Sequence, residues 1–266
     1  MHERAIHIDD AHRFLFEEGG ISHPVYRDGS GPGILILHEL PGMSDACIRL
    51  ADLVLREGYT VYLPLFFGSP GQSSGLRGLA SVLCLRREFH LFATDRSSPI
   101  SGWLVALCRR IKEECGGKGV GAIGMCLTGG IVLSLLVDDT VLAPVVSQPA
   151  LPLLLEVPWA PPLAERKAAL GLSPADLAAA VERSATVPVL GYRFATDKIC
   201  PRERFATLEK AFGPGFRGTE IPTGPENPGG IPDGAHSVFT GEFVNEPGHP
   251  TRRALDEVLA HFRRQL

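Results

Sequence analysis

The sequence predicts an α/β protein built on a doubly wound, mainly parallel sheet with helices on both faces. Apolar segments of strand length alternate along the chain with amphipathic segments of helix length, which is the pattern of repeated βα units. The strand-length segments are apolar almost throughout, as expected for parallel strands that are covered on both sides. Because no composition change marks a linker, we expect one domain spanning residues 1–266.

Six segments are predicted as strands because they are short and mainly apolar. In chain order they are GILILHE (33–39), TVYLPLF (60–66), VGAIG (120–124), TVLAPVVSQP (140–149), TVPVLGYRFA (186–195) and FRGTEIP (216–222). Helical patterns separate most of them, so neighbouring strands are expected to run parallel.

The helical segments have apolar residues at the spacing of one helix face. The clearest are ACIRLADLVLREGY (46–59), which should end near Gly58, and ISGWLVALCRRIKEEC (100–115). The others are expected roughly over 76–92, then at LTGGIVLSLLV (127–137), PRERFATLEKAF (201–212) and PTRRALDEVLAHFRRQL (250–266).

Two regions interrupt the alternation. Residues 151–185 are rich in Pro and Ala, and we expect an insertion there with a short helix capped by Ser173. Residues 222–236 are rich in Gly and Pro, which is typical of a loop.

Composition narrows the functional classes. The formal net charge of −4 and the pI of about 6.1 argue against nucleic acid or an anionic membrane as a partner. No apolar run approaches the roughly 20 residues of a membrane-spanning helix, and residues 1–20 show no secretory h-region. The six cysteines contain no C-x-x-C pair, so a reduced, cytoplasmic protein is the simplest expectation.

The segment GAIGMCLTGG places Cys126 at a corner between an expected strand and an expected helix. Ligands of open parallel sheets bind at the carboxyl ends of strands, and the pattern fits a nucleophile elbow. The following helix N-terminus would favour a thiolate, and the Leu127 N–H would be free for an oxyanion. A buried structural cysteine is the alternative. One departure from the elbow pattern is Thr128, which displaces the glycines to positions 129 and 130.

A nucleophile needs a base and an acid that orients the base. In an elbow-type fold the chain order is nucleophile, acid, histidine. Asp197 follows the strand 186–195, and His236 lies in the loop after the last strand, so both stand where that order requires. The alternatives are that Asp197 only begins the next helix and that His236 is an ordinary loop residue.

The end of the strand 33–39 carries His38 and Glu39. Ionisable residues directly after such an apolar run should lie at the rim of the site, or else form a solvated turn before Pro41 and Gly42. In the functional interpretation Glu39 tunes the thiol, and the Leu40 N–H completes an oxyanion hole with that of Leu127.

Four stretches taken together resemble the dienelactone hydrolase family, which has the α/β-hydrolase fold. They are residues 34–68, 120–136, 194–201 and 234–239. The resemblance implies a carboxylic ester hydrolase with a Cys-His-Asp triad formed by Cys126, His236 and Asp197. It also implies Glu39 as the group that takes the thiol proton when substrate binds, and an acyl-enzyme thioester. The expected partner is a small ester or lactone, and no metal or organic cofactor is implied.

The departures from the family concern the substrate. The best-known members bind a substrate carboxylate through an arginine four residues after the histidine, and here that residue is Thr240. A second such arginine would be Arg86 or Arg87, although both could equally be exposed helix charges. Dienelactone itself is therefore not predicted as the substrate.

Other functions stay open at this point. A non-catalytic member could have kept the fold for ligand binding or a regulatory interaction. Alternatively, Cys126 could be a redox-sensing thiol with Cys200 as its resolving partner. The remaining cysteines, at 47, 84, 108 and 115, are interpreted as packing residues. The oligomeric state is expected to be monomer or homodimer.

Overall fold

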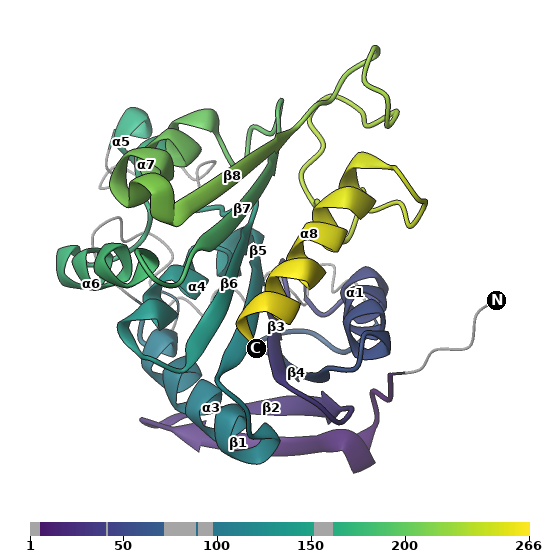
Figure 1. Cartoon of the computed structure of the whole chain (residues 1–266), viewed down its shortest axis with the longest axis vertical. Helices are drawn as coiled ribbons and strands as arrows, with labels where there is room; N and C mark the ends of the chain where they lie inside the picture. The colour runs from purple at the N-terminus through teal and green to yellow at the C-terminus, as the bar shows by residue number, and fades with distance from the viewer. Residues whose placement is uncertain (1–5, 41, 72–88, 90–97, 152–161) are drawn as a thin grey trace.

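The computed structural model describes residues 6–40, 42–71, 89, 98–151 and 162–266. In this part of the chain one eight-stranded sheet has the order β1-β2-β4-β3-β5-β6-β7-β8 (Figure 1). The strands are β1 (Arg13–Glu18), β2 (Ile21–Asp28), β3 (Gly33–Leu37), β4 (Thr60–Pro64), β5 (Val120–Met125), β6 (Val141–Ser147), β7 (Val189–Phe194) and β8 (Phe216–Ile221). All pairings from β4 to β8 are parallel, so the carboxyl ends of β3, β5, β6 and β7 lie along one edge of the sheet.

The six predicted strands are confirmed, and each is shorter than its sequence segment except β5, which extends by one residue to Met125. The antiparallel hairpin of β1 and β2 was not predicted. Its signal is present in the sequence, because Gly19 and Gly20 both have positive φ, 58° and 77°, as a two-residue hairpin turn requires. This hairpin joins the parallel part of the sheet through antiparallel pairing of β2 with β4.

Helices cover the sheet on both faces, as the doubly wound prediction requires. On one face α1 (Asp45–Arg56) and α8 (Pro250–Gln265) pack on Ile34, Ile36 and Val145, and α8 crosses the front of the sheet in Figure 1. The opposite face carries α3 (Ile100–Cys115), α4 (Ile131–Ser134), α6 (Pro174–Ser184) and α7 (Arg202–Phe212). The sheet therefore separates two apolar cores.

The predicted helix 127–137 is not continuous. It is divided into a 3₁₀ turn, η2 (Cys126–Thr128), the single α-helical turn α4, and a second 3₁₀ turn, η3 (Leu135–Val137). Two glycines follow η2, and the Ser134 hydroxyl donates back to the Ile131 carbonyl at 2.7 Å, which favours tightened, irregular turns. So short a helix contributes little macrodipole, and the expectation that a helix N-terminus favours the thiolate is weakened accordingly.

The region 151–185 contains α5 (Leu163–Ala168) and α6 in its described part. The Ser173 hydroxyl accepts the Asp176 N–H at 3.1 Å, so the predicted N-cap is confirmed. The loop predicted over 222–236 contains no helix or strand. The helix expected over 76–92 lies outside the described residues except for Phe89, which is buried.

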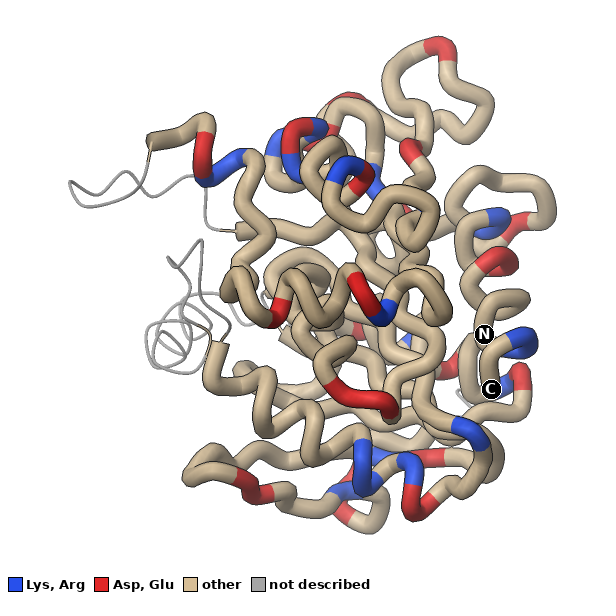
Figure 2. Tube along the Cα trace, turned by 60° about the vertical axis from the view of Figure 1, so that its left-hand side comes forward, with Lys and Arg blue, Asp and Glu red and all other residues tan. Residues whose placement is uncertain are grey.

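Acidic and basic residues are interspersed on the described part of the chain in the view of Figure 2, where neither sign collects on a single element. Several of them are neighbours on one helix, such as Arg56 and Asp52, whose side chains are 2.8 Å apart. None of the described helices is long and apolar enough to cross a membrane.

Candidate active site

The residues singled out at the strand ends converge on the carboxyl edge of the sheet. Cys126 follows β5, Glu39 follows β3 and Asp197 follows β7, while His236 comes from the loop between β8 and α8. Direct hydrogen bonds join His236 to Asp197 and the neighbouring Ser237 to Glu39. The edge therefore holds a thiol, an imidazole and two carboxylates supplied by four separate segments.

Cys126 occupies a strained corner. Its φ is 54°, in the left-handed region that costs a non-glycine residue about 1–2 kcal/mol. The corner is possible because two nearby residues have no side chain. A Cβ on Gly124 would lie 2.4 Å from the Thr128 carbonyl oxygen, and one on Gly129 would lie 2.8 Å from the Ser147 carbonyl oxygen. Strain of this kind is found preferentially at functional positions.

Thr128, which departs from the expected glycine pattern, stabilises the turn after β5 through the hydrogen bonds of its hydroxyl group. Its hydroxyl accepts the Met125 N–H at 3.0 Å. The hydroxyl proton faces the carbonyl oxygens of Met125 at 2.9 Å and Leu37 at 3.0 Å. One buried side chain thus ties the turn after β5 to the end of β3, just before Glu39.

The carboxylate of Asp197 is held on both oxygens. Its Oδ1 accepts the backbone N–H groups of Ile199 at 2.8 Å and Cys200 at 3.0 Å, while Oδ2 lies 2.7 Å from His236 Nδ1. Its side chain is fully buried. Asp197 does not begin α7, whose N-cap is Pro201; one oxygen instead organises the turn before that helix, and the other lies against the imidazole.

His236 is a strong base in this setting. Burial lowers its pKa, but the hydrogen bond to Asp197 and the interactions with Asp197 and the thiolate form of Cys126 outweigh burial and raise the pKa to about 10. Its Nε2 is buried and has no hydrogen-bond partner in the described part of the chain, while Cys126 contributes to the raised pKa. The buried Asp197 carboxylate on Nδ1 favours the protonated form of the imidazole.

Glu39 is buried and surrounded by neutral donors. Its carboxylate accepts from Ser237 Oγ at 3.0 Å, from Gln148 Nε2 at 3.3 Å and from the Thr240 hydroxyl. Burial raises its pKa, and these hydrogen bonds only partly oppose the effect. No Lys or Arg within the described residues forms an ion pair with this carboxylate. Thr240 stands where the family resemblance would put an arginine, and its hydroxyl group donates to Glu39 instead.

His38 is neither a rim group nor part of a solvated turn, which corrects both expectations. It is 1% exposed, and its Nε2 accepts the Phe66 N–H at 3.1 Å. Its Nδ1–H therefore donates to the Glu39 carbonyl at 3.0 Å. Burial lowers its pKa to about 4. A neutral ring with both nitrogens engaged can fix the end of β3 but cannot shuttle protons.

Sequence reasoning missed Gln148, the residue directly after β6. It is fully buried and has a φ of 31°. Besides binding Glu39, its Oε1 accepts the hydroxyl of Ser147 and the backbone N–H of Val238 at 3.4 Å. The signal was a polar residue at the carboxyl end of an apolar strand, the same signal that singled out Glu39, but here the residue was included in the predicted strand.

Arg193 was also missed, because it lies within an apolar strand segment. Its guanidinium is buried, forms an ion pair with Glu220, and donates to the carbonyl oxygens of Cys200 at 3.0 Å and Asp197 at 3.2 Å. The side chain thereby holds both ends of the turn that presents the Asp197 carboxylate.

The proposed oxyanion donors lie on neighbouring strand ends. Leu127 is the second residue of η2, where a backbone N–H has no acceptor within the helix. Leu40 lies in a turn closed by the Gly42 N–H donating to the Glu39 carbonyl at 2.9 Å. Because β3 and β5 are paired, both N–H groups belong to the same part of the edge. Arg86 and Arg87 lie outside the described residues.

Cys200 does not fit a resolving role. Its thiol is fully buried, and burial raises its pKa to about 12, so a reactive thiolate is disfavoured. Cys47 and Cys108 are buried as well, and burial raises the pKa of both thiols. Cys84 lies outside the described residues.

One group among the described residues has the side chains for a metal ion, namely His7, His12 and Asp28. It lies before and within the β1–β2 hairpin, away from the carboxyl edge. His7 Nδ1 is 2.9 Å from Asp28, and His12 Nδ1 is 2.8 Å from Asp9. The two rings are stacked, and the side chain of His7 is 59% exposed while that of His12 is 35% exposed.

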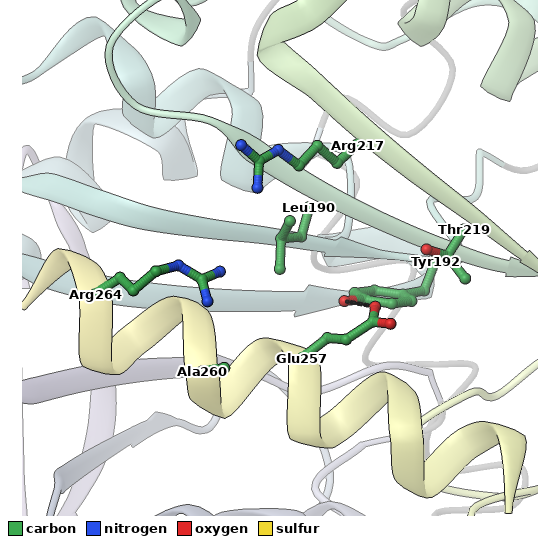
Figure 3. A pocket seen from close by; sticks show the side chains of 7 residues that line it. All are labelled: Leu190, Tyr192, Arg217, Thr219, Glu257, Ala260 and Arg264. Atoms are coloured by element: carbon green, nitrogen blue, oxygen red, sulfur yellow. Dashed lines mark hydrogen bonds between the residues drawn. The ribbon is translucent and has the colours of Figure 1, made fainter.

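A shallow cavity of about 250 Å³ lies between β7, β8 and α8. Figure 3 shows Arg217 and Arg264 pointing into it from opposite sides, with Tyr192 and Glu257 at its other end. None of its lining residues belongs to the group around Cys126, so it is separate from the candidate active site.

Comparison with protein families gives a match to the Dienelactone hydrolase family over residues 21–213. The match includes Cys126, Glu39 and Asp197 and ends before the loop that carries His236. Among proteins with curated descriptions, none matches this sequence significantly.

Solved structures share the fold at low sequence identity. A candidate dienelactone hydrolase from Klebsiella pneumoniae subsp. pneumoniae has a TM-score of 0.61 and 15% identity, covering 94% of this chain and 97% of that chain. Dienelactone hydrolase from Anabaena variabilis has a TM-score of 0.56 and 15% identity, with 96% and 97% covered. Est1E from Butyrivibrio proteoclasticus has a TM-score of 0.54 and 13% identity, with 95% and 98% covered.

Proposed function

This chain belongs to the dienelactone hydrolase family, and on that premise we propose that it is a cysteine-dependent hydrolase of small esters or lactones. The observation that carries the proposal is the Asp197–His236 hydrogen bond of 2.7 Å beside Cys126. A base oriented by a buried carboxylate, next to a thiol on a strained turn, is the arrangement of nucleophilic catalysis.

In the proposed reaction the Cys126 thiolate attacks the ester carbonyl carbon. The carbonyl π electrons move to oxygen, and the N–H groups of Leu40 and Leu127 stabilise the oxyanion. Collapse of the tetrahedral intermediate expels the alkoxide, which takes the proton of His236 Nε2. A thioester on Cys126 remains.

The second half regenerates the thiolate. His236, now neutral, removes a proton from water as the water oxygen attacks the thioester carbonyl. Cleavage of the C–S bond releases the acid and returns the imidazolium–thiolate pair. Asp197 keeps the ring in one orientation throughout and stabilises its protonated form, which its hydrogen bond to Nδ1 supports.

Glu39 is the proposed acceptor of the thiol proton when the resting enzyme is protonated at Cys126. Its raised pKa suits it to receive a proton. To do so its carboxylate would exchange at least one of its bonds, to Ser237, Gln148 or Thr240, for the thiol. Activation would then be coupled to the movement of one side chain.

Hydrolysis of a panel of small chromogenic esters together with cis- and trans-dienelactone tests the proposal. Cys126→Ala should abolish turnover, and Asp197→Asn should reduce it severely by misorienting His236. Cys115→Ser, which changes a half-buried thiol on α3, serves as the matched control and should retain turnover. Wild-type rates in Cys126→Ala would refute the assignment of the nucleophile. Absence of turnover of every ester by the wild-type protein would favour a non-catalytic, ligand-binding member.

A further inference from the structure

Arg204 is a buried cation that the proposed reaction has not yet used. It lies in the first turn of α7 and is 1% exposed. Its guanidinium donates to three backbone carbonyl oxygens, those of Arg166 at 2.6 Å, Ala169 at 2.7 Å and Pro149 at 3.0 Å. Within the described part of the chain no carboxylate pairs with it.

A buried guanidinium without a counter-ion is costly. Moving a charge out of water disfavours the folded state strongly unless an opposite charge or strong hydrogen bonds compensate. Arg193, the other fully buried arginine of this region, has Glu220 as its counter-ion. Arg204 has only the partial charges of carbonyl groups, so the site around it retains a positive potential.

Two of the acidic groups that interact with Arg204, Asp197 and Cys126, belong to the candidate active site, and the others are Cys200 and the exposed Glu203. Burial lowers the pKa of Arg204, whereas the negative charges of Cys200, Asp197 and Cys126 act in the opposite direction. Of these three, Asp197 is already compensated by His236 and by two N–H groups, and the Cys200 thiol stays neutral. The thiolate of Cys126 is the anion whose charge varies during the proposed reaction.

Arg204 is also connected to Cys126 through the backbone. Its Nη1 holds the Pro149 carbonyl, and the next residue, Ala150, donates its N–H to the Cys126 carbonyl at 2.9 Å. The Cα of Pro149 lies where a Cβ on Gly129 would approach it to 2.9 Å. The segment leaving β6 is therefore clamped between Arg204 and the turn that carries the thiol.

We propose that Arg204 is a positioning residue for Cys126: it fixes the segment after β6 against the Cys126 turn and supplies a permanent buried positive charge that stabilises the thiolate. The proposal rests on the proposed function only in taking Cys126 as the nucleophile. A charge held by carbonyl groups suits this purpose, because no carboxylate among the described residues forms an ion pair with it.

The test is the rate of alkylation of Cys126 by iodoacetamide between pH 5 and pH 9, followed by mass spectrometry of the peptide that contains Cys126. Alkylation reports thiolate directly and needs no substrate. In Arg204→Met we expect the rate at pH 6 to fall at least about tenfold and the pH profile to move upward, because the buried charge is lost. Lys210→Met, which removes an exposed charge from the same helix, is the matched control and should alkylate like wild type.

Arg204→Lys separates the charge from the clamp, and it keeps the test informative where Arg204→Met does not fold. Lysine retains a positive charge but cannot bind three carbonyls with the same planar geometry. We expect a pH profile of alkylation close to wild type together with a lowered kcat for ester hydrolysis. If Arg204→Met folds and alkylates with the pH profile of wild type, the proposal is overturned. It is also overturned if the pH profile of Arg204→Lys shifts as far as we expect for Arg204→Met. If Cys126→Ala still hydrolyses esters while the Arg204 variants shift alkylation, the proposed function fails and the effect of Arg204 on the thiol stands.

Discussion

Replacing Thr128 with valine tests how the turn after β5 is held, because it removes a hydroxyl and keeps the shape of the side chain. Thr128 is fully buried. In Thr128→Val the buried Met125 N–H loses its acceptor, and the carbonyl oxygens of Met125 and Leu37 lose a donor. An unpaired buried donor costs about 1–3 kcal/mol and the lost donated bond about 1 kcal/mol, so we expect the free energy of unfolding to fall by about 3 kcal/mol.

The same variant should affect rate beyond its effect on stability. Thr128 joins the turn of Cys126 to the end of β3, which presents Leu40, so a loose turn separates the thiol from one of its proposed oxyanion donors. Small misplacements of reacting groups reduce rates by up to about a hundredfold. We expect kcat/KM for a chromogenic ester to fall at least about tenfold under conditions where the variant is fully folded.

Thr128→Ser is the matched control, since serine keeps the hydroxyl and loses one buried methyl. Loss of the methyl should lower the free energy of unfolding by about 1 kcal/mol, with kcat/KM within about threefold of wild type. Urea denaturation and steady-state kinetics on the two variants decide the matter. If valine preserves kcat/KM while serine reduces it, the methyl packs the turn and the hydroxyl bridge has no part in catalysis.

Three further predictions concern His236, the strand before Cys126 and the core beneath α3. The raised pKa of His236, about 10, means that its contribution to stability is complete below pH 6.5 and lost as the pH rises to about 10; urea midpoints across this range should decline, and less so in Cys126→Ala. Gly124→Ala should lower the free energy of unfolding by about 3 kcal/mol, since its Cβ would lie 2.4 Å from a backbone oxygen, whereas Gly102→Ala in α3 has open space and should raise it by up to about 1 kcal/mol; equal effects would contradict the geometry. Cys108→Ala should shift the thermal midpoint and leave kcat unchanged because the thiol is buried in the core; a change in kcat alone would be inconsistent with a packing role.

The features that could be predicted from the sequence are those that depend on local residue patterns and on the order of residues along the chain. Each parallel strand was recognisable from its own residues, and the order of Cys126, Asp197 and His236 along the chain was enough to expect them at one edge. The structure places His236 against Asp197, while the roles of the three residues remain a proposal.

What the sequence did not predict depends on contacts between distant residues. Gln148 meets Glu39 across 109 positions, and Thr240 meets it across 201, so neither bond has a local signal. The break of the helix after Cys126 is likewise a balance between the clamped turn and the packing of α4, which periodicity alone does not reveal. The β1–β2 hairpin is different, because its two consecutive glycines were readable.

At Cys126 the left-handed backbone conformation lowers the stability of the protein, while the side chain at the same position is the proposed nucleophile. Glycine would adopt the same φ without strain, so the protein would become more stable by about 1 kcal/mol while losing its thiol. A library screened only for survival after heating would therefore be expected to favour loss of the thiol at this position. Directed evolution of a more stable variant therefore has to select for catalytic activity in every round as well as for stability.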